Sequence, residues 1–469
     1  MVHGNVTRTP FKASFVGTWC AGLVFVAATH MLWLWLFGTD PDLRQQLVLV
    51  SLGCALVCVV TVALLQRSAG GWRPFGEVAA AVCVEAALET RGSTAESVSL
   101  PRTIPSRRGR QLRFLAWGIG IPTVLLGIVA LAAGTPQRPE LVQRIHRVGG
   151  EFGIARAEKV SDVRHKSSRG KDHYTATVVV RLPVGAGAQP VSTTVKPTTA
   201  EPLSPGDPVE VLYAPAQPRL GAVAGDDRSL GWKLRGETMP AYMRWFLVAA
   251  SVLSWFLAVN YLSAKHGLRA FSRLGKNDKA IRGSYTRVGG HFDTAGEEQV
   301  LRGKYLEIGT DAGRLRFYTD MGRNGLPEAM TDRRLWLCWD AHRGARGSRL
   351  SPSTTPAALV FDTGLVVHGM MRVAETQLVN AGAVSVEKAA SAPNEDRSLR
   401  LFDPRAQWPL YIQPLALQAC VVVIACAALL TFDVATGWRW AAGIVGFLGA
   451  CGAGGAVLDE GPHAKRTAA

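Results

Sequence analysis

The residues with the most recognisable chemistry are the Asp-Thr-Gly at 362–364, which lie between two apolar runs. Aspartic proteases carry such a tripeptide in such a setting, and their chemistry needs two Asp side chains that share one proton. The sequence holds no second copy, because residues 293–296 are Asp-Thr-Ala-Gly, with an inserted Ala. Asp-Thr-Gly is also an ordinary tight turn between two short strands. The pattern therefore predicts a hairpin turn rather than a protease site.

A second group with possible chemistry combines histidines and aspartates, which bind zinc in many proteins. Its members are His146, His165, His173, Asp162 and Asp172. Their spacing matches no zinc motif, and residues 164–173 are typical of a solvated, basic hairpin tip. Contact with anionic lipid or polymer is an alternative role for this tip.

Other catalytic signatures are missing from the sequence. There is no phosphate-binding G-x-x-x-x-G-K-[ST], no G-x-S-x-G and no H-E-x-x-H. We therefore predict no catalytic residue, no cofactor site and no metal site, and expect that the protein is not an enzyme. The net charge of +16 would suggest nucleic acid only if the basic residues clustered on one folded face. They gather beside apolar segments instead, so we expect no nucleic-acid binding.

Six segments are apolar enough and long enough to cross a bilayer, since about 20 helical residues span a hydrocarbon core of about 30 Å. They are Ser14–Phe37, Leu47–Leu65, Phe114–Ala133, Tyr242–Leu262, Pro414–Phe432 and Trp438–Leu458. The expected fold class is a polytopic α-helical membrane protein with six transmembrane helices and two small β-rich soluble domains. The helix expected at Gly76–Arg91 packs either on a soluble domain or on the membrane surface.

Charge asymmetry predicts the orientation of the helices. The 66–113 connector holds eight Arg against four Glu, which favours the cytoplasm. We therefore expect a multi-pass protein of the cell membrane with both termini cytoplasmic. The expected parts are residues 1–134 (helices one to three), 135–240 (extracytoplasmic β domain), 241–262 (helix four), 263–413 (cytoplasmic β domain), 414–458 (helices five and six) and 459–469 (cytoplasmic tail).

Two groups of basic residues beside the membrane segments predict contact with anionic lipids. They are Arg107, Arg108, Arg110 and Arg113 before helix three, and Lys265, Arg269 and Arg273 after helix four. A strip of small residues in helix six predicts a helix–helix contact, because such strips let backbones approach closely. Its members are Ala442, Gly446, Ala450 and Gly454.

Alternating apolar residues and Gly or Pro turns predict strands in both soluble domains. In the first they are Ala155–Val163, His173–Leu182, Pro190–Val195, Asp207–Tyr213 and Leu220–Ala224. In the second they are Tyr305–Ile308, Arg314–Thr319, Arg334–Trp339, Ala357–Phe361 and Leu365–Gly369. The run Leu-Trp-Leu-Cys-Trp at 335–339 is uniformly apolar, which predicts a central strand.

The sequence PGDPVEVLYAP at 205–215 resembles the closing motif of the bacterial Domain of Unknown Function family 3592. The resemblance covers about residues 147–224, with a weaker second copy at about 287–372, and implies a small β domain in a membrane setting without catalysis. Residues 147–160 and 287–300 agree without gaps at eight positions, so we predict that the two domains are duplicates on opposite faces of the membrane. The preference for Arg over Lys, and for Ala, Gly and Val, is similar to that of an actinobacterium.

These observations predict a non-enzymatic envelope protein that binds or scaffolds. The alternatives are a transporter or channel component, and a membrane-bound enzyme of unfamiliar type. Polar side chains along a path between the helices would favour transport. Convergent carboxylates or histidines of shifted pKa in a cleft would favour an enzyme.

Overall fold

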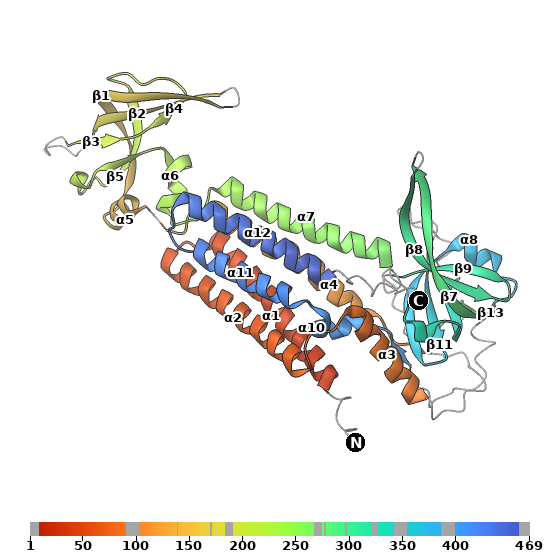
Figure 1. Cartoon of the computed structure of the whole chain (residues 1–469). Coiled ribbons are helices and arrows are strands. Elements are labelled where there is room, and N and C mark those ends of the chain that lie inside the picture. Colours follow the sequence, from red (N-terminus) through yellow and green to blue (C-terminus); the bar gives the residue numbers. More distant parts are fainter. Residues whose placement is uncertain are drawn as a thin grey trace.

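The computed structural model describes residues 9–90, 103–137, 139–168, 171–182, 191–266, 274–275, 278–295, 298–319, 326–341, 354–385 and 399–458. Long helices lie side by side in a bundle, with one β domain at each end (Figure 1). The helices of the bundle are α1 (Thr9–Phe37), α2 (Pro41–Ser68), α4 (Arg108–Ala133), α7 (Ala241–His266), α11 (Pro414–Leu430) and α12 (Thr436–Leu458). Each of them covers one of the six predicted apolar segments.

Four of these helices, α1, α2, α4 and α7, are individually long and apolar enough to cross a membrane. A fifth candidate is the pair formed by Pro404–Tyr411 and α11, which is bent by 71°. Helix α12 is not among these candidates in the described part of the chain. The structure therefore contains four to five candidate spans together with two β-sheet regions.

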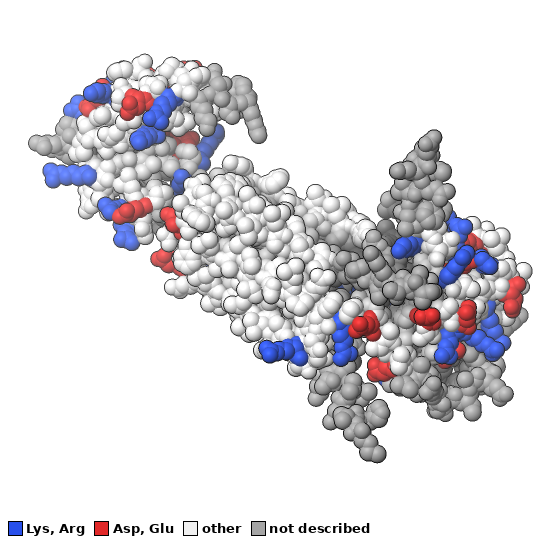
Figure 2. Space-filling model, in the orientation of Figure 1, with Lys and Arg blue, Asp and Glu red and all other residues white. Residues whose placement is uncertain are grey.

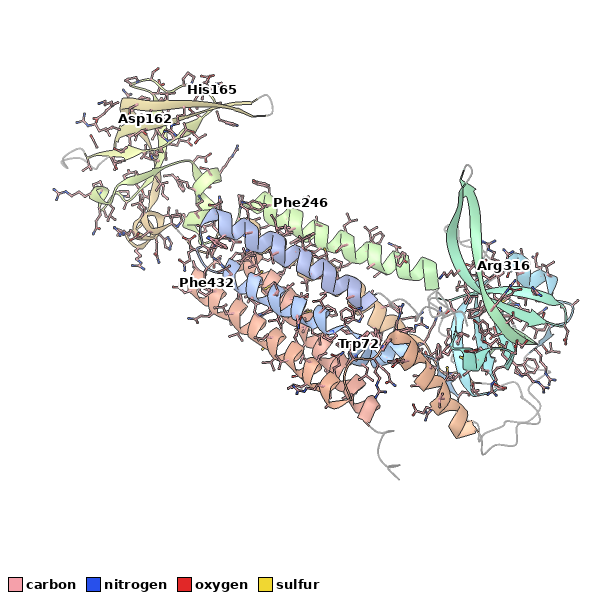
Figure 3. The ribbon with its side chains drawn as sticks, in the orientation of Figure 1. Trp72, Asp162, His165, Phe246, Arg316 and Phe432 are labelled. Carbon is pink, nitrogen blue, oxygen red and sulfur yellow. The ribbon has the colours of Figure 1, made fainter. Side chains whose placement is uncertain are left out.

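The surface of the bundle differs from that of the β domains. On the face shown in Figure 2, charged residues gather on the two β domains and at the ends of the bundle, and the middle is free of them. Exposed aromatic residues lie toward both ends, including Trp72 at one end and Phe432 at the other (Figure 3). An uncharged belt flanked by aromatic residues is the surface that a bilayer requires.

The first β domain is a curled antiparallel sheet in the order β3-β2-β1-β5-β6, with β4 also paired to β2. Its strands are β1 (Glu151–Ser168), β2 (Lys171–Arg181), β3 (Ser192–Val195), β4 (Thr198–Thr199), β5 (Pro208–Tyr213) and β6 (Ala222–Ala224). The edge strands β3 and β6 contact each other, and the inner face buries a compact apolar core around Val178 and Val211. Two short helices, α5 (Glu140–Arg147) and α6 (Asp227–Leu234), cover the outer side of Leu212.

The second β domain is a closed barrel in the order β7-β8-β9-β12-β11-β10, in which β10 pairs back with β7. Its strands are β7 (Asp278–Ala295), β8 (Glu298–Thr310), β9 (Gly313–Tyr318), β10 (Arg334–Asp340), β11 (Thr354–Phe361) and β12 (Leu365–Arg372). Two short strands, β13 (Val384–Ser385) and β14 (Arg400–Leu401), pair with β7 and β12. Strand β10 is central, as predicted, because Leu337 points into the barrel core while Trp336 and Cys338 lie under Ile104 outside it.

The two β domains share a strand order. In each domain the first strand forms a hairpin with the next strand on one side and pairs with a later strand on its other side. That later strand is β5, which contains Val211, in the first domain and β10, which contains Leu337, in the second. The alignment that suggested the duplication is wrong in register, however. Arg147 ends α5 before a turn at Gly149, whereas Arg287 lies in the middle of β7. Duplication of the domain stays a prediction that rests on topology alone.

Helix α3 (Phe75–Thr90) joins the bundle to the barrel. Its buried face, which includes Phe75, Val78 and Cys83, belongs to one apolar core that runs from Cys58 of α2 to Leu337 inside the barrel. The helix contacts the 3₁₀ turns η3 (Glu328–Met330) and η5 (Pro404–Gln407). Helix α3 therefore packs on a soluble domain, which is one of the two roles expected for it.

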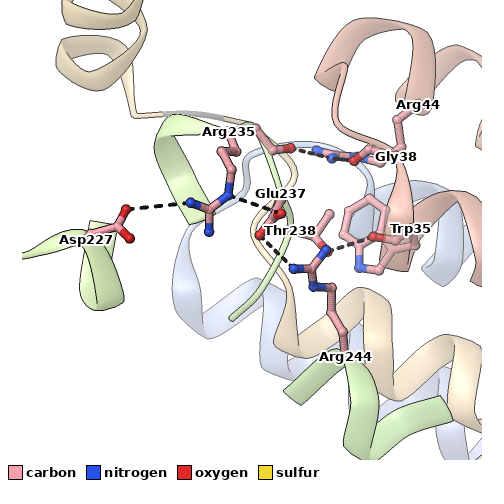
Figure 4. Close-up of polar contacts among 9 residues, drawn as sticks. Trp35, Gly38, Arg44, Asp227, Arg235, Glu237, Thr238 and Arg244 are labelled. Carbon is pink, nitrogen blue, oxygen red and sulfur yellow. Dashed lines mark hydrogen bonds and ion pairs between the residues drawn. The ribbon is translucent and has the colours of Figure 1, made fainter. Parts of the chain in front are cut away.

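The first domain joins the bundle through polar contacts instead (Figure 4). The buried guanidinium of Arg44 donates to the carbonyl oxygens of Gly38 and Gly236, each at 2.8 Å. Thr238 Oγ1 donates to the carbonyl of Trp35 at 2.7 Å, and Arg244 pairs with Glu237 at 2.9 Å. These contacts satisfy backbone carbonyls where helices end, which would otherwise lack partners.

Candidate ligand site in the helical bundle

Five helices of the bundle form a ring around an apolar cavity. Helices α1, α2, α11, α12 and α4 contact one another in that order, α4 contacts α1 again, and α7 packs against α4. The cavity has a volume of about 180 Å³ and is lined by residues of these five helices and by Trp408 and Ile412. Alanines such as Ala28, Ala55 and Ala453 face it, and their small side chains leave the space open.

The cavity lining is almost entirely apolar. Among the described lining residues, the polar groups are the hydroxyl of Ser51 and the indole N–H groups of the two Trp residues. Ser51 Oγ already donates to the carbonyl of Leu47 at 2.9 Å and lies 3.0 Å from Nδ1 of His30. An engineered apolar cavity of about 150 Å³ stays dry and binds benzene. A cavity of this size and lining suits a small apolar group or part of a hydrocarbon chain.

Two of the residues that line the cavity, Trp117 and Trp408, are in contact with each other. The rings of Trp117 and Trp408 meet edge to face with centroids 5.8 Å apart. Trp408 lies in the short helix α10 (Trp408–Tyr411), which approaches α1 so closely that a Cβ on Gly17 would lie 2.5 Å from Pro409 Cγ. The bend after α10 is held by Gln66, whose Nε2 donates to the carbonyl of Ile412 at 2.7 Å.

A second, smaller space of about 20 Å³ is also lined by these two Trp residues. We call it the arginine pocket; it is lined by Arg110, Arg113, Phe114, Trp117, Arg405, Trp408 and Tyr411. The guanidinium groups of Arg405 and Arg110 lie 5.0 and 5.7 Å from the centre of the Phe114 ring. Arg113 forms an ion pair with Asp403 at 3.0 Å. Trp117 and Trp408 therefore belong to both spaces.

The basic residues predicted to touch lipid are divided by the structure. Arg108 is exposed, but Arg107 and Arg110 are each only 5% exposed and lie within the protein. Charge counting could not separate them, because a buried and an exposed arginine look alike in sequence. Lys265 lies in α7, and its side chain, with Arg269 and Arg273, falls outside the described residues.

The predicted strip of small residues in α12 faces other helices of this chain. A Cβ on Gly446 would lie 3.3 Å from Cys426 of α11 and 3.4 Å from Ile128 of α4. A Cβ on Gly454 would lie 3.2 Å from Ile121 of α4. The other two members of the strip, Ala442 and Ala450, are buried.

The polar residues that could have marked a transport path lie at the edge of the bundle. Asn260 Nδ2 donates to the carbonyl of Phe256 in its own helix, and Gln418 is exposed. His30 is exposed, and its Nδ1 bonds to Ser51 of the neighbouring helix. None of the three lines the cavity.

The other candidate residues make contacts within the turns and strands of the two β domains. Asp362 starts the predicted turn between β11 and β12, Gly364 has a φ of +81°, and the Asp362 carboxylate lies 3.7 Å from Arg333. His165 stacks on Tyr174 at 4.7 Å and lies on the first β domain with Asp162 (Figure 3). No group of three metal-binding side chains occurs among the residues whose positions are described. Asp172 has no described side chain.

Sequence reasoning missed part of the arginine pocket and one buried histidine. Arg405, Trp408 and Tyr411 fall in a segment assigned to the soluble domain, yet a basic and aromatic run before an apolar helix is typical of a membrane interface. His368 on β12 is 2% exposed, and its Nε2 lies 2.7 Å from the carbonyl of Pro105. Burial lowers the pKa of His368 to about 4.

Comparisons of the chain with protein-family models, with curated proteins and with solved structures found no match.

Proposed function

We propose that the chain is an integral membrane protein with six spans that holds two β domains on opposite faces of a cell membrane, as a binding or scaffold protein. Each of the six long helices runs along the bundle in Figure 1, and the barrel lies at the same end as the start of α1 and the end of α12. In this proposal α12 also crosses the bilayer, packed against α4 and α11.

The observation that carries the proposal is the continuous apolar core between the bundle and the barrel. It connects Cys20 and Cys58 of the membrane helices with Phe75 of α3 and with Phe361 inside the barrel. Packed interiors transmit displacements because they are as dense as organic crystals. A change in the bundle, such as occupancy of the cavity, would therefore reach the cytoplasmic barrel.

Transport of an apolar solute is the second candidate, favoured by the cavity inside the helical ring. Ion or polar-solute transport is less well supported, because polar groups that mark such paths do not line this cavity in the described residues. The resemblance of residues 205–215 to the Domain of Unknown Function family 3592 is compatible with either candidate, and it remains part of the proposal.

The orientation follows from the arginine-rich 66–113 connector, which we place in the cytoplasm with both termini and the barrel. Reporter fusions test it. A fusion after Thr199 should be active as an extracytoplasmic reporter, and a fusion after Pro327 as a cytoplasmic one. The reverse pattern would show that the protein is inverted, and the same side for both would contradict an odd number of crossings between the domains.

A further inference from the structure

Three aromatic rings in contact with one another form part of the lining of the apolar cavity. Phe25 of α1 meets Trp117 of α4 edge to face, with ring centroids 5.2 Å apart, and Trp117 meets Trp408 in the same manner at 5.8 Å. All three side chains line the cavity. A Cβ on Gly120 would overlap the ring of Phe25, so the glycine lets this ring pack against α4. The three rings therefore form one continuous aromatic row along the cavity.

Sulfur atoms also line the cavity. They belong to Cys20, Met31, Cys58 and Cys420. Sulfur is polarisable and makes favourable contacts with aromatic rings, and aromatic rings gain energy from edge-to-face neighbours beyond the area that they bury. A lining that combines an aromatic row with sulfur atoms therefore favours an aromatic occupant over an alkyl chain.

The volume and the polarity of the cavity limit the occupant further. An engineered apolar cavity of about 150 Å³ binds benzene, and this cavity has about 180 Å³. No charged side chain lines it among the residues that the structure describes, and the hydroxyl of Ser51 already donates to the carbonyl of Leu47. A charged or strongly polar group of a ligand would lose its water there without gaining enough partners. The occupant that fits is therefore neutral and has a single ring.

We propose that the cavity binds one neutral, single-ring aromatic molecule, of which toluene is an example, taken up from the hydrocarbon part of the bilayer. A bilayer concentrates such molecules around the bundle, because apolar groups move from water into hydrocarbon. A buried engineered cavity takes up benzene, so the site needs no permanent opening. The assignment rests on the proposed membrane setting and names the class of ligand for the proposed binding role.

A bound ring would also act on the barrel, because the cavity shares residues with the barrel core. Cys20 and Trp408 line the cavity and belong to the apolar core that reaches Leu337. A ligand that binds only the folded state stabilises that state, so occupancy should stabilise the barrel together with the bundle. Absence of binding would leave the reporter fusions unchanged, and an inverted topology would leave binding unchanged, so the two proposals can fail separately.

The test is photolabelling of the full-length protein in phosphatidylcholine vesicles with (trifluoromethyl)phenyldiazirine, an apolar probe with a single ring. Mass spectrometry locates the labelled residues. Probe dissolved in the lipid labels exposed side chains such as Phe246 in proportion to its concentration, whereas labelling of a binding site saturates. We expect saturable labelling of residues that line the cavity, and its displacement by toluene. Heptane at the same concentration should displace the probe at least about threefold less well, because it makes no ring–ring contacts.

Two matched variants on α12 test where the saturable site lies. Ala453 lines the cavity, and Ala441 is exposed on the same helix. Ala453→Leu fills part of the cavity and should weaken probe binding about tenfold or more, whereas Ala441→Leu should leave it unchanged. If Ala453→Leu does not yield folded protein by size-exclusion chromatography, Ala55→Leu fills the cavity from α2 instead.

Three outcomes would overturn the proposal. Labelling of the cavity residues that rises without saturation, in step with that of Phe246, would show that the probe reaches them only as a dissolved solute. Equal loss of saturable labelling in Ala453→Leu and Ala441→Leu would place the site outside the cavity. Displacement by heptane as effective as displacement by toluene would show a site for any hydrocarbon, including an acyl chain of a lipid.

Discussion

The first and second β domains have the same strand order but are attached to the bundle by different physical means. The first has a core of its own and meets the helices through hydrogen bonds from Arg44 and Thr238 to backbone carbonyls. The second shares its core with α1, α2 and α3. A polar junction fixes position while leaving two cores to unfold separately, whereas a shared core makes the barrel and the membrane helices one cooperative unit.

The largest contrast should come from matched truncations in the two domains. Leu212 on β5 and Leu337 on β10 are both fully buried, and replacing a buried Leu by Ala costs about 2–5 kcal/mol. We expect Leu212→Ala to destabilise the first domain only, and Leu337→Ala to destabilise the barrel together with the bundle. Limited proteolysis of the purified protein, read by fragment, measures where each variant opens. If both variants made the same parts of the protein sensitive to protease, the proposed difference between the two domains would be wrong.

Acid should act on the second domain through His368. Its folded pKa of about 4 lies below the usual value of about 6.5, so the unfolded state binds a proton first as the pH falls. Stability is therefore fully present above pH 6.5 and is lost between about pH 6.5 and 4, by up to about 3 kcal/mol. His368→Gln keeps a donor for the Pro105 carbonyl without titrating, and should flatten this dependence in thermal unfolding. If the stability of that variant depended on pH as the wild type does, other groups would be responsible for the acid sensitivity.

Overpacking of the helical ring should have an intermediate effect. Gly446→Leu places a side chain against Cys426 and Ile128, and such insertions cost about 1–3 kcal/mol. Gly452 lies on the same helix, and a Cβ added there would have no neighbouring atom within 4 Å, so Gly452→Leu is the matched control. We expect lower folded yield for Gly446→Leu alone, measured by size-exclusion chromatography. Indistinguishable yields would mean that α12 can move away from α4 without cost.

The smallest effect is expected at the turn of the barrel. Asp362 pairs at 3.7 Å with a half-exposed Arg333, and such surface pairs contribute about 0–1 kcal/mol. Asp362→Asn should therefore lower the melting temperature only slightly and abolish no activity. Loss of a demonstrable proteolytic activity in this variant would overturn the interpretation of Asp362 as a turn residue.

The helices and most strands could be predicted from sequence because apolar length and alternation depend on local composition. The predicted segment Asp207–Tyr213 differs from β5 by a single residue. Strand β7 was missed, since residues 278–295 mix Gly and charges and are paired on both sides only through the closed barrel. The arginine pocket was missed for a related reason: Arg110 and Arg405 are far apart in the sequence, and both lie over the ring of Phe114 only in the folded chain. Contacts of this kind depend on tertiary packing.

The central claim, a core shared by the bundle and the barrel, is tested most directly by hydrogen exchange in full-length protein carrying Trp408→Ala. Trp408 is 5% exposed at the end of the cavity, whereas Trp440 on α12 is 58% exposed and provides the control Trp440→Ala. The shared core predicts faster exchange in α3, β7 and β10 of Trp408→Ala, with β1, β2 and β5 unchanged. Unaltered exchange in β7 and β10, or equal acceleration in both β domains, would contradict it.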